Sequence, residues 1–263
     1  MFTSEQKAHF DTFGFVVLRC CYSAVEMAQL GSMFDTVMAE RVQSSERVEI
    51  WPCVVDFALG NGALSRTFVE RNCMFDTITA LLGGDFLWYG LSYNLFGGNS
   101  RWHPDQHGDE RGSVKALLYL DPLRRWNGCL RVIPGSHRSH LHEMLKPHQP
   151  PGDDPDSAMF GLTGSEVPAH ALESDPGDMI IFSKCLWHAA FGAADKRRMV
   201  SFSFAPHRAT PDQIQYLRHF FQQEADVLPP RPAPAELLRR AGRERMAGII
   251  GRLTGLGLHS PGR

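Results

Sequence analysis

The sequence lacks the features that mark several classes of protein. No stretch is apolar enough for a membrane span, and the first ten residues, MFTSEQKAHF, carry no signal-peptide core. Neither charge predominates, since 27 Lys and Arg stand against 29 Asp and Glu and the formal net charge is −2. A balance this close to neutral creates no field for binding phosphates, and no RNA- or DNA-binding motif is present. We therefore expect a cytoplasmic protein that binds neither membranes nor nucleic acid.

Cysteine is sparse and follows no recognisable pattern. The six Cys lie at positions 20, 21, 53, 73, 129 and 185, without a Cys-x-x-Cys pair. Because such spacing and a secretory signal are both lacking, we expect reduced thiols rather than a disulfide framework. There is no internal repeat, and 263 residues with 43% hydrophobic content suffice for one large core. The chain is predicted to form a single domain over residues 1–263.

Hydrophobic patterning predicts a mainly β fold with flanking helices. Short apolar runs broken by Gly, Pro and Asn indicate strands at residues 13–19, 86–96, 114–120, 129–133, 178–182 and 198–204. Helical periodicity is found at residues 23–42, 212–228 and 235–253, the last two separated by a Pro-rich break. Short strands of this kind are typical of a double-stranded β-helix, or jelly roll, here with a core at about residues 10–206.

Two segments outside the predicted strands suggest further roles. Residues 146–168 are polar and rich in Pro and Gly, and an insertion of that length is usually either disordered or a lid over an active site. Residues 207–263 form a C-terminal helical extension whose basic amphipathic helix needs an apolar partner surface. Docking on the domain itself or on a second subunit, as a homodimer, is favoured over membrane binding because Glu236 and Glu244 interrupt the positive face.

The strongest chemical signal is a set of two histidines and an aspartate. His103 and Asp105 flank a proline, and His188 follows far along the chain. Alternate residues of a strand project from the same side, so His103 and Asp105 can reach one ion while a distant strand supplies His188. Such a set holds Fe(II) on one face and leaves the opposite face open. His107 and Asp109 repeat the His-x-Asp pattern with the same parity, so the pattern alone leaves both pairs as candidates.

Longer motifs around these residues resemble the phytanoyl-CoA dioxygenase family of Fe(II)/2-oxoglutarate oxygenases. They are Trp-His-x-Asp at 102–105, the turn NGCLRVIPGSH at 127–137 and Gly-Asp at 177–178, and the similarity runs from FDTFGFVVLR at 10–19 to about residue 206. The resemblance implies a jelly roll that holds Fe(II) through His103, Asp105 and His188, and it selects this pair over His107 and Asp109. It also implies that the enzyme uses O2, converts 2-oxoglutarate to succinate and CO2, and oxidises a small molecule.

In that family an arginine after the distal histidine binds the far carboxylate of 2-oxoglutarate. Arg197 and Arg198 both follow His188, and aligning RRMVSFSFA with the family's Arg-x-Ala-x-Ser pattern selects Arg197. A guanidinium makes two parallel hydrogen bonds to a carboxylate, and strand alternation then turns Arg198 to solvent. Ala190 replaces the family's serine two residues after the distal histidine, and Asn94 is a candidate replacement donor to the co-substrate.

Four residues are candidates for contact with the substrate: His107, Tyr93, Tyr119 and Ser201. His107 lies two residues after Asp105, so in a continuing strand its side chain would project from the same side. Ser201 lies on the same predicted strand face as Arg197. Tyr93 and Tyr119 lie in predicted strands, where aromatic residues more often belong to the core.

These motifs favour a hydroxylase or oxidative cyclase that acts on a small molecule, such as a microbial natural product. An acyl-CoA hydroxylase is less favoured, because no basic cluster for the CoA phosphates is evident near the motifs. Halogenases that resemble this family replace the carboxylate ligand by Ala or Gly, whereas Asp105 is present. A jelly-roll module that binds a metal or a sugar without oxygenase chemistry is the alternative from another class, and the complete triad with Arg197 argues against it.

Overall fold

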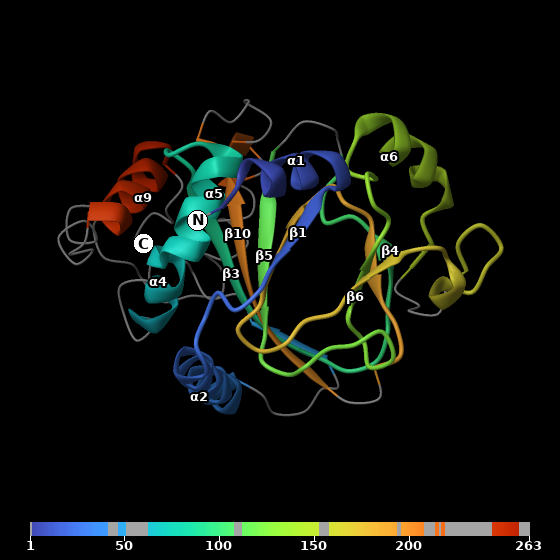
Figure 1. The fold of residues 1–263 in the computed structure, drawn as a ribbon, viewed down its shortest axis with the longest axis horizontal. Helices are drawn as coiled ribbons and strands as arrows, with labels where there is room; N and C mark the ends of the chain where they lie inside the picture. Colours follow the sequence, from blue (N-terminus) through green and yellow to red (C-terminus); the bar gives the residue numbers. More distant parts are fainter. Residues whose placement is uncertain are drawn as a thin grey trace.

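Two antiparallel β-sheets face each other in the computed structural model, which confirms the predicted jelly roll (Figure 1). The structure describes residues 2–41, 47–50, 63–107, 112–152, 158–193, 196–207, 214–215, 217–218 and 244–257. The larger sheet has the strand order β1-β8-β5-β10-β3-β2, and the smaller sheet has the order β4-β9-β6-β7. Strands far apart in the sequence are therefore neighbours, which is how this fold brings distant motifs together.

The predicted strands are confirmed, and the described residues include four further short strands. The larger sheet consists of β1 (Phe15–Leu18), β2 (Arg47–Ile50), β3 (Leu87–Phe96), β5 (Val114–Tyr119), β8 (Met179–Ser183) and β10 (Arg197–Ala205). The smaller sheet consists of β4 (Ser100–His103), β6 (Leu130–Val132), β7 (His170–Leu172) and β9 (His188–Ala190).

The helices lie mainly on the larger sheet, on the side away from the smaller one (Figure 1). They are α2 (Ala24–Arg41), α4 (Ala63–Glu70), α5 (Asn72–Leu82) and α9 (Glu244–Gly255). Helix α1 (Ser4–Phe13) contacts β1, and α6 (Ser139–Leu145) lies beside the smaller sheet. Two short 3-10 helices, η1 (Lys146–His148) and η2 (Gly164–Glu166), follow α6.

Strand alternation gives the larger sheet two apolar faces. Leu91 and Val200 point toward the helices and belong to a core cluster that includes Phe34 of α2. Leu117 and Ile180 point the other way, into a second cluster between the two sheets. Both faces of these strands are buried, so the larger sheet is the central layer of the molecule.

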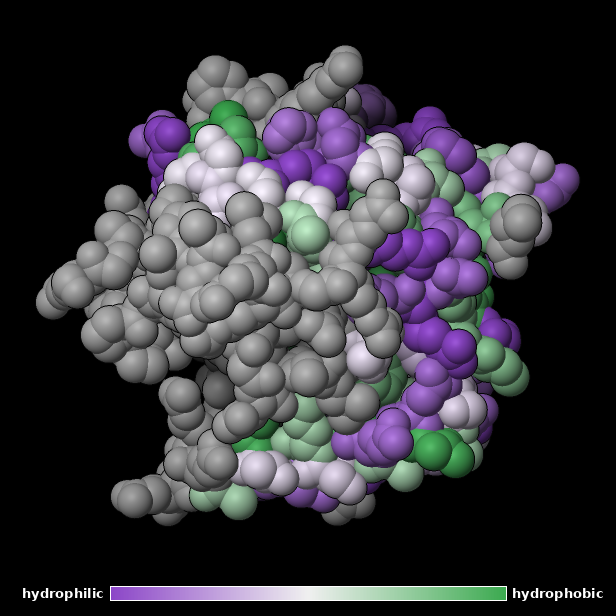
Figure 2. Space-filling model, turned by 90° about the vertical axis from the view of Figure 1, so that its left-hand side faces the viewer, coloured by the Kyte–Doolittle hydropathy of each residue, from purple (hydrophilic) through white to green (hydrophobic). Residues whose placement is uncertain are grey.

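The C-terminal helix α9 packs on its own domain. Four of its apolar residues are at most 1% exposed: Met246, Ile249, Ile250 and Leu253. The guanidinium of Arg252 also donates a hydrogen bond to the carbonyl of Phe86 at 3.0 Å. Figure 2 shows this side of the molecule, where the described surface is mainly hydrophilic with small separate hydrophobic areas. The apolar face that suggested a homodimer is thus buried within the chain, while residues 235–243 lie outside the described part.

No helix among the described residues combines the length and the hydropathy needed to cross a membrane. Of the predicted helix at residues 212–228, residues 214–215 and 217–218 are described, and they are helical.

The segment 146–168 packs on the outer side of the smaller sheet. The indole of Trp102 in β4 donates a hydrogen bond to the carbonyl of Gly164 at 2.8 Å, and Met159 and Val167 join a buried cluster around that tryptophan. The described residues of the segment do not line the cavity between the sheets. Residues 153–157 lie outside the described part, and the lid at residues 146–168 stays a prediction.

The expectation of reduced thiols must be corrected for one pair of cysteines. Cys21 and Cys73 form a disulfide that joins the segment before α2 to helix α5. Cys20, Cys129 and Cys185 are free thiols, and Cys53 lies outside the described residues. The two bonded residues are separated by 52 positions in the sequence, so local spacing could not indicate that the fold brings them together.

The turn before β8 requires glycine at position 177. Gly177 has φ +102°, and a Cβ atom there would lie 2.5 Å from the carbonyl oxygen of Tyr22. We expect Gly177→Ala to lower the free energy of unfolding by about 1–3 kcal/mol, the typical cost of a strained backbone conformation. Urea denaturation followed by tryptophan fluorescence measures this change.

Gly84→Ala is the matched control for that substitution. Gly84 lies in a turn without a positive φ, and its added Cβ would meet only the Thr79 side chain, at 4.0 Å. It should change the free energy of unfolding by less than about 0.5 kcal/mol. Equal effects of the two substitutions would contradict the steric argument.

Candidate metal centre

The fold places His103 directly opposite His188. His103 ends β4, His188 begins β9, and the two residues are register partners with ring centroids 4.4 Å apart. Nδ1 of His103 lies 2.8 Å from the Arg101 carbonyl, and Nδ1 of His188 lies 2.9 Å from the Leu186 carbonyl. A carbonyl oxygen only accepts hydrogen bonds, so each Nδ1 carries the proton and each Nε2 keeps a lone pair for a metal.

Asp105 completes a group of three candidate ligands. Candidate ligand atoms of His103, Asp105 and His188 all lie within 4.8 Å of one another, and Asp105 Oδ1 is 3.8 Å from His188 Nε2. Asp105 does not continue the strand as was predicted, because β4 ends at His103 and Asp105 lies in the bend after Pro104. The bend, and not the pleat of a strand, turns the carboxylate toward the histidines.

The second His-x-Asp pair is placed differently. His107 Nδ1 lies 3.2 Å from His142 Nε2, and its ring packs near Trp187. His107 contributes no ligand atom to the group of three and does not line the cavity between the sheets. Asp109 lies outside the described residues. The structure therefore does not bring His107 to the wall where a substrate contact was expected.

Burial and neighbouring charges keep the three groups in the protonation states that bind metals. Burial, with a contribution from His103, lowers the pKa of His188 to about 3, and burial also lowers the pKa of His103. Burial alone would raise the pKa of Asp105, but Lys115, His188 and Lys184 hold it well below its usual value. At neutral pH the site therefore offers two neutral imidazoles and one carboxylate.

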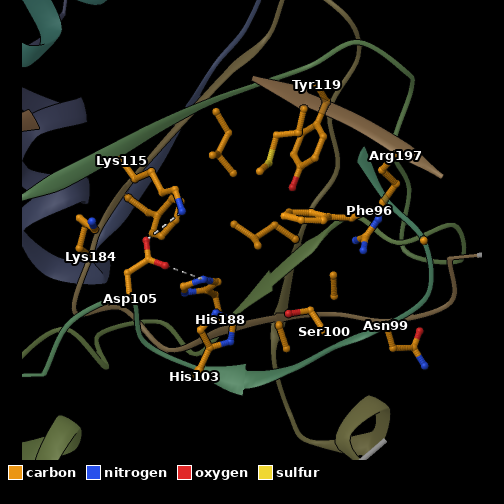
Figure 3. Close-up of a pocket in the computed structure, with 17 residues that line it drawn as sticks. Phe96, Asn99, Ser100, His103, Asp105, Lys115, Tyr119, Lys184, His188 and Arg197 are labelled. Carbon is orange, nitrogen blue, oxygen red and sulfur yellow. Dashed lines mark ion pairs between the residues drawn. The ribbon is translucent and has the colours of Figure 1, made fainter. Parts of the chain in front are cut away.

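A cavity of about 360 Å³ lies between the sheets beside these ligands. Figure 3 shows Arg197, Phe96 and Asn99 toward one end of it, and Lys115 and Lys184 beside Asp105 toward the other. Apolar side chains complete the wall: Leu117, Leu130, Phe182 and Met199. The cavity therefore has two cationic ends, with the candidate metal ligands beside one of them.

Arg197 and Arg198 face opposite ways, as predicted. Arg197 is 6% exposed and lines the cavity, where its guanidinium donates hydrogen bonds to the carbonyls of Gly128 at 2.6 Å and Gly98 at 2.9 Å. Arg198 was expected in solvent, but its side chain is only 35% exposed and is ion-paired with Asp121 at 2.7 Å. The two arginines alternate as predicted, but Arg198 is held in an ion pair at a partly exposed position instead of being free in solvent.

The glycine of the Asn127-Gly128 turn makes room for Arg197. Gly128 has φ +94°, and a Cβ atom there would lie 2.7 Å from the Ala193 Cβ and 3.0 Å from the Arg197 Cδ. No other residue fits this turn without displacing the guanidinium. The motif that indicated the family thus has a steric function at this site.

Asn94 and Ser201 take part in a buried hydrogen-bond network instead of lining the cavity. The Asn94 amide donates to the Ser92 hydroxyl at 2.8 Å, and that hydroxyl lies 2.6 Å from the Ser201 hydroxyl. Both residues are on the inward faces of their strands but are absent from the cavity wall. The structure therefore gives Asn94 no contact with the space where a co-substrate would bind.

The two tyrosines lie on opposite faces of the larger sheet. Tyr93 packs in the cluster beneath the helices, with its hydroxyl 3.6 Å from Met33 Sδ, so the expected substrate contact is wrong for this residue. Tyr119 lines the cavity, and burial raises its pKa to about 12, which keeps the phenol protonated as a donor. Ala190 also lines the cavity, as the family pattern implies for this position.

Two lysines line the cavity without having been predicted from the motifs. Lys115 is a charged residue inside the apolar run VKALLY, and Lys184 directly follows the apolar β8. A charge within an otherwise buried strand was the available signal, since lysine is almost never fully buried without a partner. Phe96, Asn99 and Ser100 also line the cavity without having been predicted.

A sequence model of the family described as phytanoyl-CoA dioxygenase (PhyH) matches residues 10–200. The chain belongs to this family. A probable phytanoyl-CoA dioxygenase of Caenorhabditis elegans is 20% identical over 248 residues, which cover 82% of this chain and 78% of that protein. As a family member the chain is an Fe(II)/2-oxoglutarate-dependent dioxygenase, and its group of two imidazoles and one carboxylate fits the iron.

The chain also resembles three solved structures in its fold. EctD from S. alaskensis, with 2-oxoglutarate and 5-hydroxyectoine, has a TM-score of 0.59 and 21% identity over 79% of this chain and 77% of its own. The epimerase SnoN, in complex with Fe3+, alpha ketoglutarate and nogalamycin RO, has a TM-score of 0.59 and 18% identity. The match covers 81% of this chain and 88% of the SnoN chain. HygX from Streptomyces hygroscopicus, with nickel and 2-oxoglutarate, has a TM-score of 0.58 and 17% identity. The match covers 78% of this chain and 87% of the HygX chain. At sequence identities this low, the similarity to these structures establishes a shared fold.

Proposed function

We propose that this dioxygenase holds Fe(II) through His103, Asp105 and His188, binds 2-oxoglutarate through Arg197, and hydroxylates or oxidatively cyclises a small molecule. The supporting observation is that a single cavity contains both the group of three candidate ligands and the buried arginine. Iron with 2-oxoglutarate supplies the oxidation of a substrate C–H bond by O2, with release of succinate and CO2.

The protein's part in this reaction is to orient the co-substrate and to exclude water. Two backbone carbonyls hold the guanidinium of Arg197, so a carboxylate entering the cavity meets donors that are already oriented. The protonated phenol of Tyr119 is a second donor on the same wall and is better placed for this task than Asn94, which bonds Ser92. Apolar side chains such as Phe182 keep the remaining wall dry.

A small substrate is supported by the size of the cavity, because about 360 Å³ is near the lower end of ligand pockets. The likeness to SnoN, whose bound ligand is nogalamycin RO, supports a natural product as the substrate class. A halogenase is disfavoured by Asp105, because its carboxylate supplies the third candidate ligand of the group. A cavity of this size also argues against an acyl-CoA that binds entirely within it.

The proposed function is tested by an assay for succinate. We expect the purified protein to convert 2-oxoglutarate to succinate when supplied with Fe(II), ascorbate and air, slowly without substrate and faster with it. Omission of Fe(II) or addition of a chelator should abolish the product, because the metal supplies the oxidation. Protein that binds Fe(II) but forms no succinate would favour the alternative, a jelly-roll metal- or sugar-binding module without oxygenase chemistry.

A further inference from the structure

Lys115 places a charge on the wall of an otherwise apolar strand. It lies in β5 opposite Ser203 of β10 and Phe182 of β8, and its side chain is only 13% exposed. Its ammonium lies 3.2 Å from Oδ2 of Asp105. A buried ammonium without a negative partner costs several kcal/mol, so this charge needs an anion nearby in each state of the enzyme.

Metal binding changes what Asp105 can offer to Lys115. A dication bound at Asp105 and a dianionic 2-oxoglutarate balance each other, which leaves the carboxylate of Asp105 as one negative charge on the cavity wall. That wall also carries three cations, Lys115, Lys184 and Arg197. In the loaded enzyme, Asp105 can therefore offset only one of them, and the remaining positive charge favours the binding of a further anionic group.

Lys184 adds positive charge at the same end of the cavity. It is 5% exposed, and its ammonium donates a hydrogen bond to the Tyr89 hydroxyl at 3.0 Å. Figure 3 shows both lysines beside Asp105, at the end away from Arg197. An anion bound at the lysine end would therefore not compete with the 2-oxoglutarate carboxylate at Arg197.

We infer that Lys115, assisted by Lys184, binds an anionic group of the substrate, which makes the substrate class a small carboxylate, phosphate or sulfate ester. This inference rests on the proposed function and adds the charge of the substrate to it. The anion and the co-substrate carboxylate bind at opposite ends of the cavity. The part of the substrate that reacts then lies between them, beside the three candidate ligands.

The test uses three probes of matched size: 3-phenylpropanoate, its neutral amide and phenyl phosphate. Each is titrated calorimetrically into protein loaded with Mn(II) and saturating 2-oxoglutarate, which prevents turnover. We expect at least one anionic probe to bind ten times more tightly than the amide, and the preferred anion identifies the class. Lys115→Gln should weaken that probe about thirtyfold or more, whereas Lys115→Arg should retain part of the affinity.

Lys146→Gln is the control, because Lys146 is an exposed lysine paired with Glu143 outside the cavity. Binding of 2-oxoglutarate is measured separately in each variant. If Lys115→Gln weakens 2-oxoglutarate and the anionic probe equally, Lys115 only positions Asp105 and the inference is overturned. Equal binding of acid and amide to the unmodified protein, or no binding of either anion, also overturns it. Failure of the unmodified protein to bind 2-oxoglutarate with the metal would instead overturn the proposed function, and this inference with it.

Discussion

Replacing His103, Asp105 or His188 by Ala is expected to remove the bound iron and to abolish turnover of 2-oxoglutarate. The three candidate ligand atoms lie within 4.8 Å of one another, so each substitution leaves only two protein ligands. Loss of an outer hydrogen-bond partner of a metal ligand alone costs about 10–100-fold in affinity, and we expect loss of a ligand to cost more than about 100-fold. The iron content of each purified variant, with circular dichroism to verify folding, measures this effect.

His107→Ala is the matched control for the metal ligands. Its imidazole contacts His142 and contributes no atom to the group of three, so the variant should retain its iron. Asp109→Ala should retain iron as well. Loss of iron in the His107 variant together with retention in the His103 variant would show that the other His-x-Asp pair holds the metal.

Replacing Arg197 by Ala is expected to weaken 2-oxoglutarate binding by roughly thirtyfold to several-thousandfold. The guanidinium is 6% exposed, and removing the partner of a desolvated carboxylate costs about 2–5 kcal/mol. Lysine at this position should restore only part of the affinity, because a point charge cannot make two parallel hydrogen bonds. Anaerobic titration of the Fe(II) protein with 2-oxoglutarate, followed by the metal-to-ligand charge-transfer band, measures the affinity.

Arg198→Ala provides the comparison within the same strand. Arg198 faces away from the cavity and pairs with Asp121 in a partly exposed position, where an ion pair contributes about 0–1 kcal/mol. Its loss should leave 2-oxoglutarate affinity within about twofold of the unmodified protein. A larger loss in the Arg198 variant than in the Arg197 variant would mean that the strand register differs by one residue.

The two tyrosines show that a strand pattern cannot predict which face of a buried strand borders the cavity. Tyr93 and Tyr119 both lie in long apolar runs, and the larger sheet is buried on both of its faces. A continuous apolar run therefore does not reveal which face of a strand borders the cavity. The register of β3 and β5 against β10 decides it, and it places Tyr119 inward opposite Met199 and Tyr93 outward opposite Val200.

The local features of this protein can be predicted from its sequence alone. Strand positions follow from short apolar runs, and the alternation of Arg197 and Arg198 follows from the two-residue period of a strand. The glycine of the Asn127-Gly128 turn is also readable, because few residues adopt its backbone conformation. The histidines and Asp105 could be singled out because they lie within longer motifs.

Which distant residues meet became clear from the three-dimensional structure. The pairing of β4 with β9 sets His103 against His188, the bend after β4 turns Asp105 toward them, and the return of β5 brings Lys115 to that carboxylate. The Cys21–Cys73 disulfide and the packing of the 146–168 segment on the smaller sheet have the same origin. Contacts between residues far apart in the chain depend on sheet register and on the packing of layers, and local periodicity carries no information about either.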